Sequence, residues 1–235
     1  MATSTVENYI KRLYLLEQAR PGQPVLMGDL ARAMRVVPGT ATTMVKALAK
    51  AGLLRHTPRV GVRLTPSGDR LALQMLRKHR LIEMFLVQTL GLDWSEIHDE
   101  AELLEHALSD RLVERLDAFL GHPRVDPHGD PIPSAAGRMP TSATLPLSDL
   151  PPKANATIAR ITRQDSEFLR FLNRAGLRPG QRLRLARRDP VADLLVVGLD
   201  DGREVSLGSK AAQDLLVQYE TPSRPRHSKV RRKKG

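Results

Sequence analysis

The chain has 235 residues, 41% of them hydrophobic, a formal net charge of +11 and no cysteine. This length leaves room for two or three small domains, and the lack of cysteine excludes disulfides, zinc ribbons and thiol catalysis. There is no signal peptide and no apolar run of transmembrane length, which predicts a cytoplasmic protein that does not enter a membrane.

The charge is distributed unevenly along the chain. Residues 1–74 hold eleven Lys and Arg against four Asp and Glu, whereas residues 75–123 hold five against ten. A basic segment attracts anions such as nucleic acid, and an acidic segment attracts cations. The contrast predicts an anion-binding module joined to a cation-binding one.

The first 74 residues have the pattern of a winged helix. A capping box at Ser4 to Glu7 begins a first helix over 4–18, and further helices are expected at about 27–34 and 40–51, the last ended by Gly52. Two extended runs, 53–56 and 62–65, flank a turn and predict a two-stranded wing. The segment 1–74 is therefore expected to be a winged helix-turn-helix DNA-binding domain.

The third helix of this domain has one apolar and one polar side. Ala41, Val45 and Leu48 fall on the apolar side, and short Thr side chains on the other let a helix approach the major groove while Lys neutralises phosphate. Arginines on the wing can add backbone or minor-groove contacts. The candidate DNA-binding residues are Gly39, Thr40, Thr42, Thr43, Lys46, Lys50, Arg59 and Arg63.

The acidic region predicts a metal site on two helices, one from Thr65-Pro66 to about residue 90 and one over 95–120. His79 and Glu83 are one turn apart on the first helix. On the second, one face carries His98, Glu102, Glu105 and His106. Packed together without a cation, three carboxylates repel one another and lose hydration, whereas a divalent ion neutralises them. Residues 75–140 are expected to form this helical metal-binding domain.

The rest of the chain is expected to be mainly β. Residues 141–155 are rich in Pro and Ser and predict a linker. A small β domain over 156–220 is expected to contain a helix at 166–175 and strands at 182–186, 194–199 and 203–207, the last two forming a hairpin. Residues 221–235 predict a basic disordered tail. The fold class is mainly α with small β parts.

Several short motifs resemble the diphtheria-toxin-repressor family of metal-dependent transcriptional repressors, which includes iron-dependent regulators and manganese transport regulators. The resemblance covers almost the whole chain. It implies a winged-helix domain, a helical dimerisation domain and a C-terminal small β-barrel, in a homodimer that binds palindromic operator DNA. The motifs are Glu7-Asn8-Tyr9-Ile10, Thr65-Pro66-Ser67-Gly68, Arg77-Lys78-His79-Arg80-Leu81, His98-Asp99-Glu100, Glu105-His106, and Asp126 to Pro133.

The resemblance also implies the metal ligands. A primary site is implied from Glu102, Glu105 and His106 with a contribution from Asn8, and a second site from His79, Glu83 and His98. Iron-type members carry a sulfur ligand at the position of Glu102, so the carboxylate favours Mn(II), with Fe(II) as the alternative. Short manganese-type members often carry an acidic residue where this chain has Lys11, which argues against a close binuclear arrangement.

Three other functions are compatible with parts of the sequence. An iron-responsive repressor of the same family would differ only in its metal. A winged-helix regulator not gated by metal would use the carboxylates for structure alone. A metal-dependent hydrolase would use a bound ion to activate water, but the chain has no nucleophile elbow, phosphate loop or HExxH motif, so we expect no enzyme activity.

Overall fold

The computed structural model describes residues 3–219, which divide into two compact units. The first contains the described residues up to Ser142 together with 164–170, and the second contains 143–163 and the described residues from Phe171 onward. Within the described residues, no helix combines the length and apolarity needed to cross a bilayer. The predicted basic tail at 221–235 lies outside the described range.

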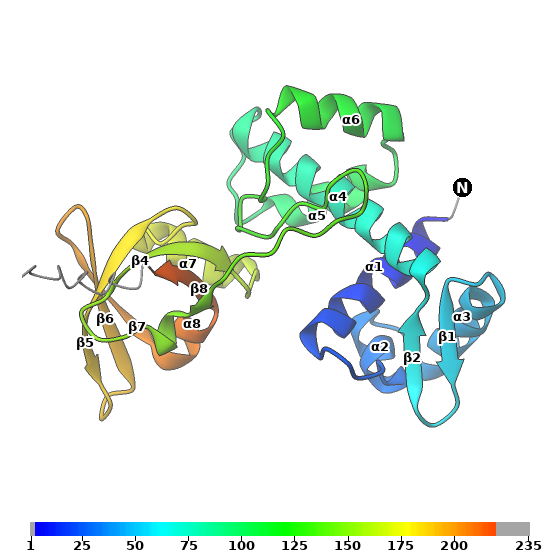
Figure 1. Cartoon of the computed structure of the whole chain (residues 1–235), viewed down its shortest axis with the longest axis horizontal. Coiled ribbons are helices and arrows are strands. Elements are labelled where there is room, and N and C mark those ends of the chain that lie inside the picture. The colour runs from blue at the N-terminus through cyan, green and yellow to red at the C-terminus, as the bar shows by residue number, and fades with distance from the viewer. Residues whose placement is uncertain (1–2, 220–235) are drawn as a thin grey trace, which may run out of the picture. The chain divides into compact units, whose positions relative to one another are not determined.

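The first unit begins with the predicted winged helix (Figure 1). The wing is an antiparallel pair in which Arg55 lies opposite Arg63. Apolar side chains from every element meet in one core that includes Ile10, Leu48 and Val62. The elements are α1 (Ser4–Ala19), α2 (Met27–Ala33), α3 (Pro38–Lys50), β1 (Leu54–Thr57) and β2 (Gly61–Leu64).

Helix α4 (Pro66–Gln88) joins the winged helix to the two helices that follow it in the acidic region, residues 75–123. These two are called the acidic helices. Its start follows the predicted signal, because the Thr65 hydroxyl accepts a hydrogen bond from the Gly68 amide. The first half of α4 buries Ala72 and Leu76 in the winged-helix core. Its second half buries Leu81 and Ile82 against the helices that follow. One continuous helix therefore belongs to both parts of this unit (Figure 1).

The prediction of a single helix over 95–120 is wrong. The structure has two helices, α5 (Ile97–Glu105) and α6 (Asp110–Phe119). The Ser109 hydroxyl caps α6 by accepting from the Leu112 amide, and Lys78 of α4 donates to the Leu108 carbonyl between the helices. These contacts satisfy backbone groups at the break, so the chain can turn there.

The second unit is an antiparallel sheet with the order β3-β8-β4-β5-β6-β7. The predicted helix and three predicted strands are present, but β3, β4 and β8 were not predicted. Strand β3 and a short 3-10 helix lie inside residues 141–155, the range predicted as a linker. The elements are β3 (Leu145–Pro146), η1 (Leu147–Asp149), β4 (Asn155–Ile161), α7 (Ser166–Ala175), β5 (Arg182–Asp189), β6 (Leu194–Leu199), β7 (Glu204–Gly208), α8 (Ser209–Gln213) and β8 (Leu215–Tyr219).

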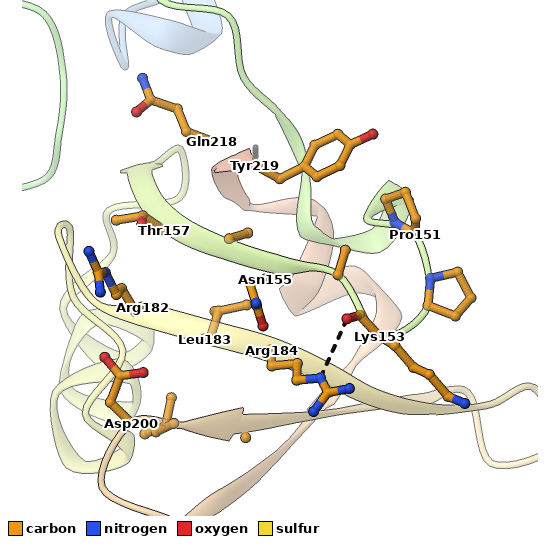
Figure 2. Close-up of a pocket in the computed structure, with 15 residues that line it drawn as sticks. Pro151, Lys153, Asn155, Thr157, Arg182, Leu183, Arg184, Asp200, Gln218 and Tyr219 are labelled. Atoms are coloured by element: carbon orange, nitrogen blue, oxygen red, sulfur yellow. Dashed lines mark hydrogen bonds between the residues drawn. The ribbon is translucent and has the colours of Figure 1, made fainter. Parts of the chain in front are cut away.

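The sheet is open, whereas a small barrel was expected. Among the described strands, the edge strands β3 and β7 have no pairing with each other. One face of the sheet carries a groove of about 1020 Å³ whose floor includes Thr157 of β4 and Arg182 of β5 (Figure 2). Tyr219 and Pro151 stand at its side, and Arg184 donates to the Lys153 carbonyl at 3.4 Å.

Candidate metal centre

Three helices of the first unit bring the predicted metal-binding side chains together. Helix α4 supplies His79 and Glu83, which are buried. Helix α5 supplies His98, Glu102 and Glu105. Most of these residues share one face of their helix, as the 3.6-residue period predicts. Half of the His98 side chain is exposed, so the cluster reaches solvent at this residue.

His79 is the centre of the cluster. Its Nδ1 atom lies 2.6 Å from Glu105 Oε2, and its Nε2 atom lies 3.0 Å from Glu83 Oε1 and 3.2 Å from His98 Nδ1. His98 Nε2 lies 3.7 Å from Glu102 Oε1. The two sets of ligands implied by the family resemblance therefore form one connected cluster, with His79 between them.

Helix α1 reaches the cluster through charged side chains. Lys11 Nζ lies 2.6 Å from Glu105 Oε1 and 3.3 Å from Glu102 Oε1. One turn earlier, Glu7 Oε2 lies 2.7 Å from Nδ1 of His106, the residue that caps the end of α5. A helix of the winged-helix core is thus connected directly to the helix that carries most of the candidate ligands.

Burial and close charges shift the pKa values of the cluster. Burial alone would lower the pKa of His79, but hydrogen bonds to Glu105 and Glu83 outweigh it and raise that pKa to about 9. Burial tends to raise the pKa of Glu83, yet contacts with His79 and His98 hold it well below its ordinary value. Lys11 likewise lowers the pKa of Glu102 against the effect of burial.

Glu83 also belongs to a second group of three possible ligands, and this group was not predicted. Glu83, Asp126 and His128 are all buried and offer ligand atoms within 4.8 Å of one another. His128 Nε2 contacts the Trp94 carbonyl at 2.8 Å, while its Nδ1 lies 3.9 Å from Glu83 Oε2 and 4.0 Å from Asp126 Oδ1. Burial and the nearby charges of Asp130 and Glu83 raise the pKa of Asp126 well above its ordinary range.

The donor atoms fit a divalent cation. Two polar atoms, Asn8 Oδ1 on α1 and His128 Nδ1 beside Glu83, are buried and make no hydrogen bond within residues 3–219. Buried polar atoms normally have partners, and an oxygen or nitrogen lone pair left without one suits a metal ion. Imidazole nitrogens and carboxylate oxygens are donors that manganese, iron and zinc accept. Asn8 lies on α1 between Glu7 and Lys11, and its role as a ligand remains a prediction.

The predicted DNA-binding residues lie mainly on the surface. Along α3, Ala41, Val45 and Leu48 are buried as expected. The hydroxyls of Thr42 and Thr43 donate to the Pro38 and Gly39 carbonyls. The remaining candidates on this helix are exposed and lie on its outer side: Gly39, Thr40, Lys46 and Lys50.

The two wing arginines differ. Arg59 lies at the tip of the wing with a φ of 64°, exposed to solvent. Arg63 is exposed but donates to the Gly22 carbonyl between α1 and α2, so it also holds the wing against the helical part. Both remain DNA-contact predictions, and Arg63 has a structural role that sequence reasoning missed.

Three known domain families match consecutive parts of this chain. Residues 1–62 match the iron dependent repressor N-terminal DNA binding domain, and residues 65–134 match the iron dependent repressor metal binding and dimerisation domain. Residues 145–219 match the FeoA domain. The iron-dependent repressor IdeR of Mycobacterium leprae is 30% identical over 228 residues, which cover 91% of this chain and 96% of that protein. The chain belongs to the iron-dependent repressor family.

Solved structures of the family agree with this fold. A manganese-dependent transcriptional repressor in complex with manganese has a TM-score of 0.82 and 42% identity, covering 92% of this chain and all of that one. The diphtheria toxin repressor of Corynebacterium efficiens is 32% identical over 187 residues, or 75% of this chain and 80% of that protein. The resemblance stated from short motifs is thereby confirmed.

Sequence reasoning about this family member missed three residues of the cluster. Glu7 was assigned to a capping box and to a motif of the family resemblance but not to the metal site, although its i, i+4 spacing from Lys11 places both on one side of α1. Asp126 and His128 lie in a loop, where no period predicts which way a side chain points. Their sequence signals were the concentration of His and Asp in the run from Asp126 to Asp130 and the place of this run among the motifs of the family resemblance.

Proposed function

We propose that this protein is a homodimeric transcriptional repressor that binds operator DNA when a divalent metal ion, most favourably Mn(II), occupies the cluster between α1, α4 and α5. The observation that carries the proposal is the contact of α1 with α5. Glu7 and Lys11, on a helix of the winged-helix core, touch Glu105 and His106 in the acidic region. A change in the charge of that region acts directly on a helix of the DNA-binding half.

The chain offers ligands for more than one ion. Glu102, Glu105 and His106 with Asn8 would hold the primary ion, and His79, Glu83 and His98 would hold a second. Glu83 also faces Asp126 and His128, which form a further candidate site. The bound ion supplies positive charge that neutralises these carboxylates. Because the set is rich in oxygen and lacks sulfur, it favours Mn(II), with Fe(II) as the alternative.

The DNA-binding surface is proposed to be α3 and the wing. The exposed side of α3 carries Thr43, Lys46 and Lys50, which suit a major groove and its phosphates. In a two-fold dimer, the angle between α1 and the acidic helices sets the separation of the paired α3 helices. Half-sites about one helical turn apart in a palindromic operator match such a pair.

The dimer surface is proposed to lie on α5 and α6. Large apolar side chains stand exposed there, with Leu103 at 74%, Phe119 at 67% and Leu112 at 53%. Exposed apolar side chains grouped on neighbouring helices mark a surface that a partner covers. The residues matched to the metal binding and dimerisation domain include all three.

Anisotropy of labelled promoter DNA at fixed salt tests this function. We expect Mn(II) to strengthen DNA binding by wild-type protein relative to EDTA. Glu105→Gln should lose most of the response, since it removes the charge of the carboxylate that contacts both Lys11 and His79. Glu100→Gln, which changes an exposed carboxylate on the same helix, should keep it. Salt must be constant because phosphate contacts depend steeply on it.

DNA binding that is equally strong in EDTA and Mn(II) would contradict the proposal and favour a winged-helix regulator not gated by metal. Replacing Mn(II) by Fe(II) or Zn(II) in the same titration ranks the metals. A stronger response to Fe(II) at matched free concentration would favour the iron-responsive alternative.

A further inference from the structure

The groove on one face of the sheet in the second unit is lined by positive charge (Figure 2). Side chains alternate along β5, so its two leucines, Leu183 and Leu185, are buried. Arg182 and Arg184 point to the other face and are exposed there. Lys153, in the segment before β4, is exposed at the same groove. Two separate segments of the unit thus bring three cations to one groove.

These cations have no anionic partner within residues 3–219. None of the three side chains forms an ion pair there, and Arg184 uses one donor on the Lys153 carbonyl. The one carboxylate among the residues that line the groove is Asp200. A guanidinium has five N–H donors. Most of the donors of Arg182 and Arg184 are therefore available to a ligand in the groove.

The floor of the groove lies low between the charged side chains. It includes Asn155 and Thr157 of β4 and Gly198 of β6, which lies opposite Arg184. A Cβ added at Gly198 would meet no neighbouring atom within 4 Å, so the space above it is open. A single water molecule takes about 30 Å³. The groove, of about 1020 Å³, has room for a segment of a polymer.

The sequence that follows the groove is also basic. Tyr219, which lines the groove, is the last described residue, and residues 220–235 hold seven Lys and Arg against one Glu. A polyanion can meet the charge of both the groove and the sequence after it. Nucleic acid carries a negative charge on every nucleotide and is the polyanion that a DNA-binding repressor encounters.

We propose that this groove is a second DNA-binding surface, which contacts the phosphate backbone of duplex DNA without reading its sequence. Arg182 and Arg184, on the same face of one strand, bind phosphate oxygens through paired N–H donors, and Lys153 adds a point charge. The inference rests on the proposed function, because it needs DNA as the partner, and adds to it a contact outside the winged helix. Backbone contacts of this kind strengthen binding to operator and to unrelated DNA alike.

Salt titrations of DNA binding by the full-length protein with Mn(II) test the proposal. The probes are a labelled duplex that extends beyond the operator on both sides and an unrelated duplex of equal length. Arg182→Gln and Arg184→Gln should each make the slope of log affinity against log salt shallower by about 1 on both duplexes, as expected for the loss of one phosphate contact. Lys210→Gln removes an equal charge from α8, outside the groove, and should leave the slope unchanged.

Gly198→Ile separates a contact in the groove from an effect of net charge. It fills the floor of the groove, leaves every charge in place and has room for the new Cβ. We expect it to weaken binding to both duplexes and to make the slope shallower by at least as much as either arginine variant does. If its melting curve shows that it does not fold, the arginine variants and Lys210→Gln decide the question alone.

Three results would overturn the inference. They are slopes in both arginine variants equal to the wild-type slope, an equal change of slope in Lys210→Gln, and a folded Gly198→Ile that binds both duplexes as wild type does. A labelled polyglutamate peptide tests the groove for acidic protein segments. Peptide binding that is lost in Arg182→Gln, with the DNA slopes unchanged, would overturn the assignment to DNA in favour of such a segment.

The two proposals fail in different ways. Promoter binding that is equal in Mn(II) and EDTA, together with a shallower slope in Arg182→Gln, would contradict the proposed metal response and leave the groove inference standing. Metal-dependent promoter binding with the same slope in wild type and both arginine variants would do the reverse.

Discussion

At the scale of single residues, His79 determines how the cluster behaves without metal. Its Nδ1 atom contacts Glu105 of α5, and its Nε2 atom contacts Glu83 of α4 and His98 of α5. Both ring nitrogens of His79 therefore connect α4 to α5. The carboxylates favour the protonated ring strongly enough to overcome burial. A proton on His79 therefore does part of what a metal ion would do.

The first prediction concerns pH and the stability of the metal-free protein. The pKa of His79 is about 9 in the folded chain and 6.5 in a model imidazole. A raised folded pKa stabilises the fold fully below pH 6.5, and the contribution is lost as pH rises through 9, on the order of 3 kcal/mol in total. We expect the free energy of unfolding by urea in EDTA to fall over this interval.

His79→Gln provides the control for this measurement because it removes the titrating group and keeps a polar side chain. The fall between pH 6.5 and 9 should be smaller in His79→Gln than in wild type. Equal pH dependence in the two proteins would show that the cluster does not hold the proton.

The residues found by sequence and those missed differ for a physical reason. His79, Glu83 and Glu105 lie within helices, where a period of 3.6 fixes the direction of each side chain. Asp126 and His128 lie in a loop, whose path depends on contacts distant in sequence, such as His128 with the Trp94 carbonyl. Periodicity can therefore predict the helical half of the cluster and not the loop half.

At the scale of elements, the start of α4 joins the wing to the acidic helices. Gly68 lies in its first turn against the wing, where an added Cβ would come 2.0 Å from the Leu53 carbonyl oxygen. The Thr65 hydroxyl caps the same turn. The close approach of backbone to backbone at this junction requires glycine.

The second prediction follows from that contact. Gly68→Ala should destabilise the protein by roughly 1–3 kcal/mol, because a backbone oxygen cannot move away as a side chain can. Gly28→Ala, on α2 with nothing within 4 Å of the added Cβ, should be neutral or slightly stabilising. Thermal unfolding of both variants measures the difference. Similar melting temperatures would contradict the packing described at this junction.

The third prediction concerns α3 as a DNA-binding element. Lys46 is exposed on the polar side of the helix. Lys46→Ala should weaken binding to operator and to unrelated DNA alike and reduce the salt slope by about 1, as expected for the loss of one phosphate contact. Lys210→Ala removes an equal charge from α8 and serves as the control. The proposed surface would be wrong if both variants had the same effect.

The break between α5 and α6 is a feature that the sequence pattern did not predict. Apolar and acidic residues continue at helical spacing across Ala107 and Leu108, so the pattern favoured one helix over 95–120. Capping by Ser109 and the contact of Lys78 with the Leu108 carbonyl are the interactions that divide it. A capping serine is visible in the sequence, but the lysine contact depends on packing.

At the scale of the whole molecule, the proposed repressor works as a pair of chains. The fourth prediction is that wild type sediments as a dimer and that Leu103→Glu sediments more as a monomer in sedimentation velocity. The substitution places a charge on an exposed apolar face of α5. Val191→Glu, at a side chain 98% exposed in the second unit, serves as the control. A monomeric wild type, or a Leu103→Glu variant that dimerises equally well, would contradict the assignment of this surface.

We infer that metal at the cluster and operator DNA at α3 act on one equilibrium through α1. Two ligands coupled in this way must strengthen each other by the same factor. The most direct test is a titration of Mn(II) into the protein with and without saturating operator DNA, followed by its mirror image, DNA titrated with and without Mn(II). We expect DNA to raise Mn(II) affinity by the factor by which Mn(II) raises DNA affinity, roughly 5- to 150-fold. Equal Mn(II) affinity in the presence and absence of operator would contradict the account.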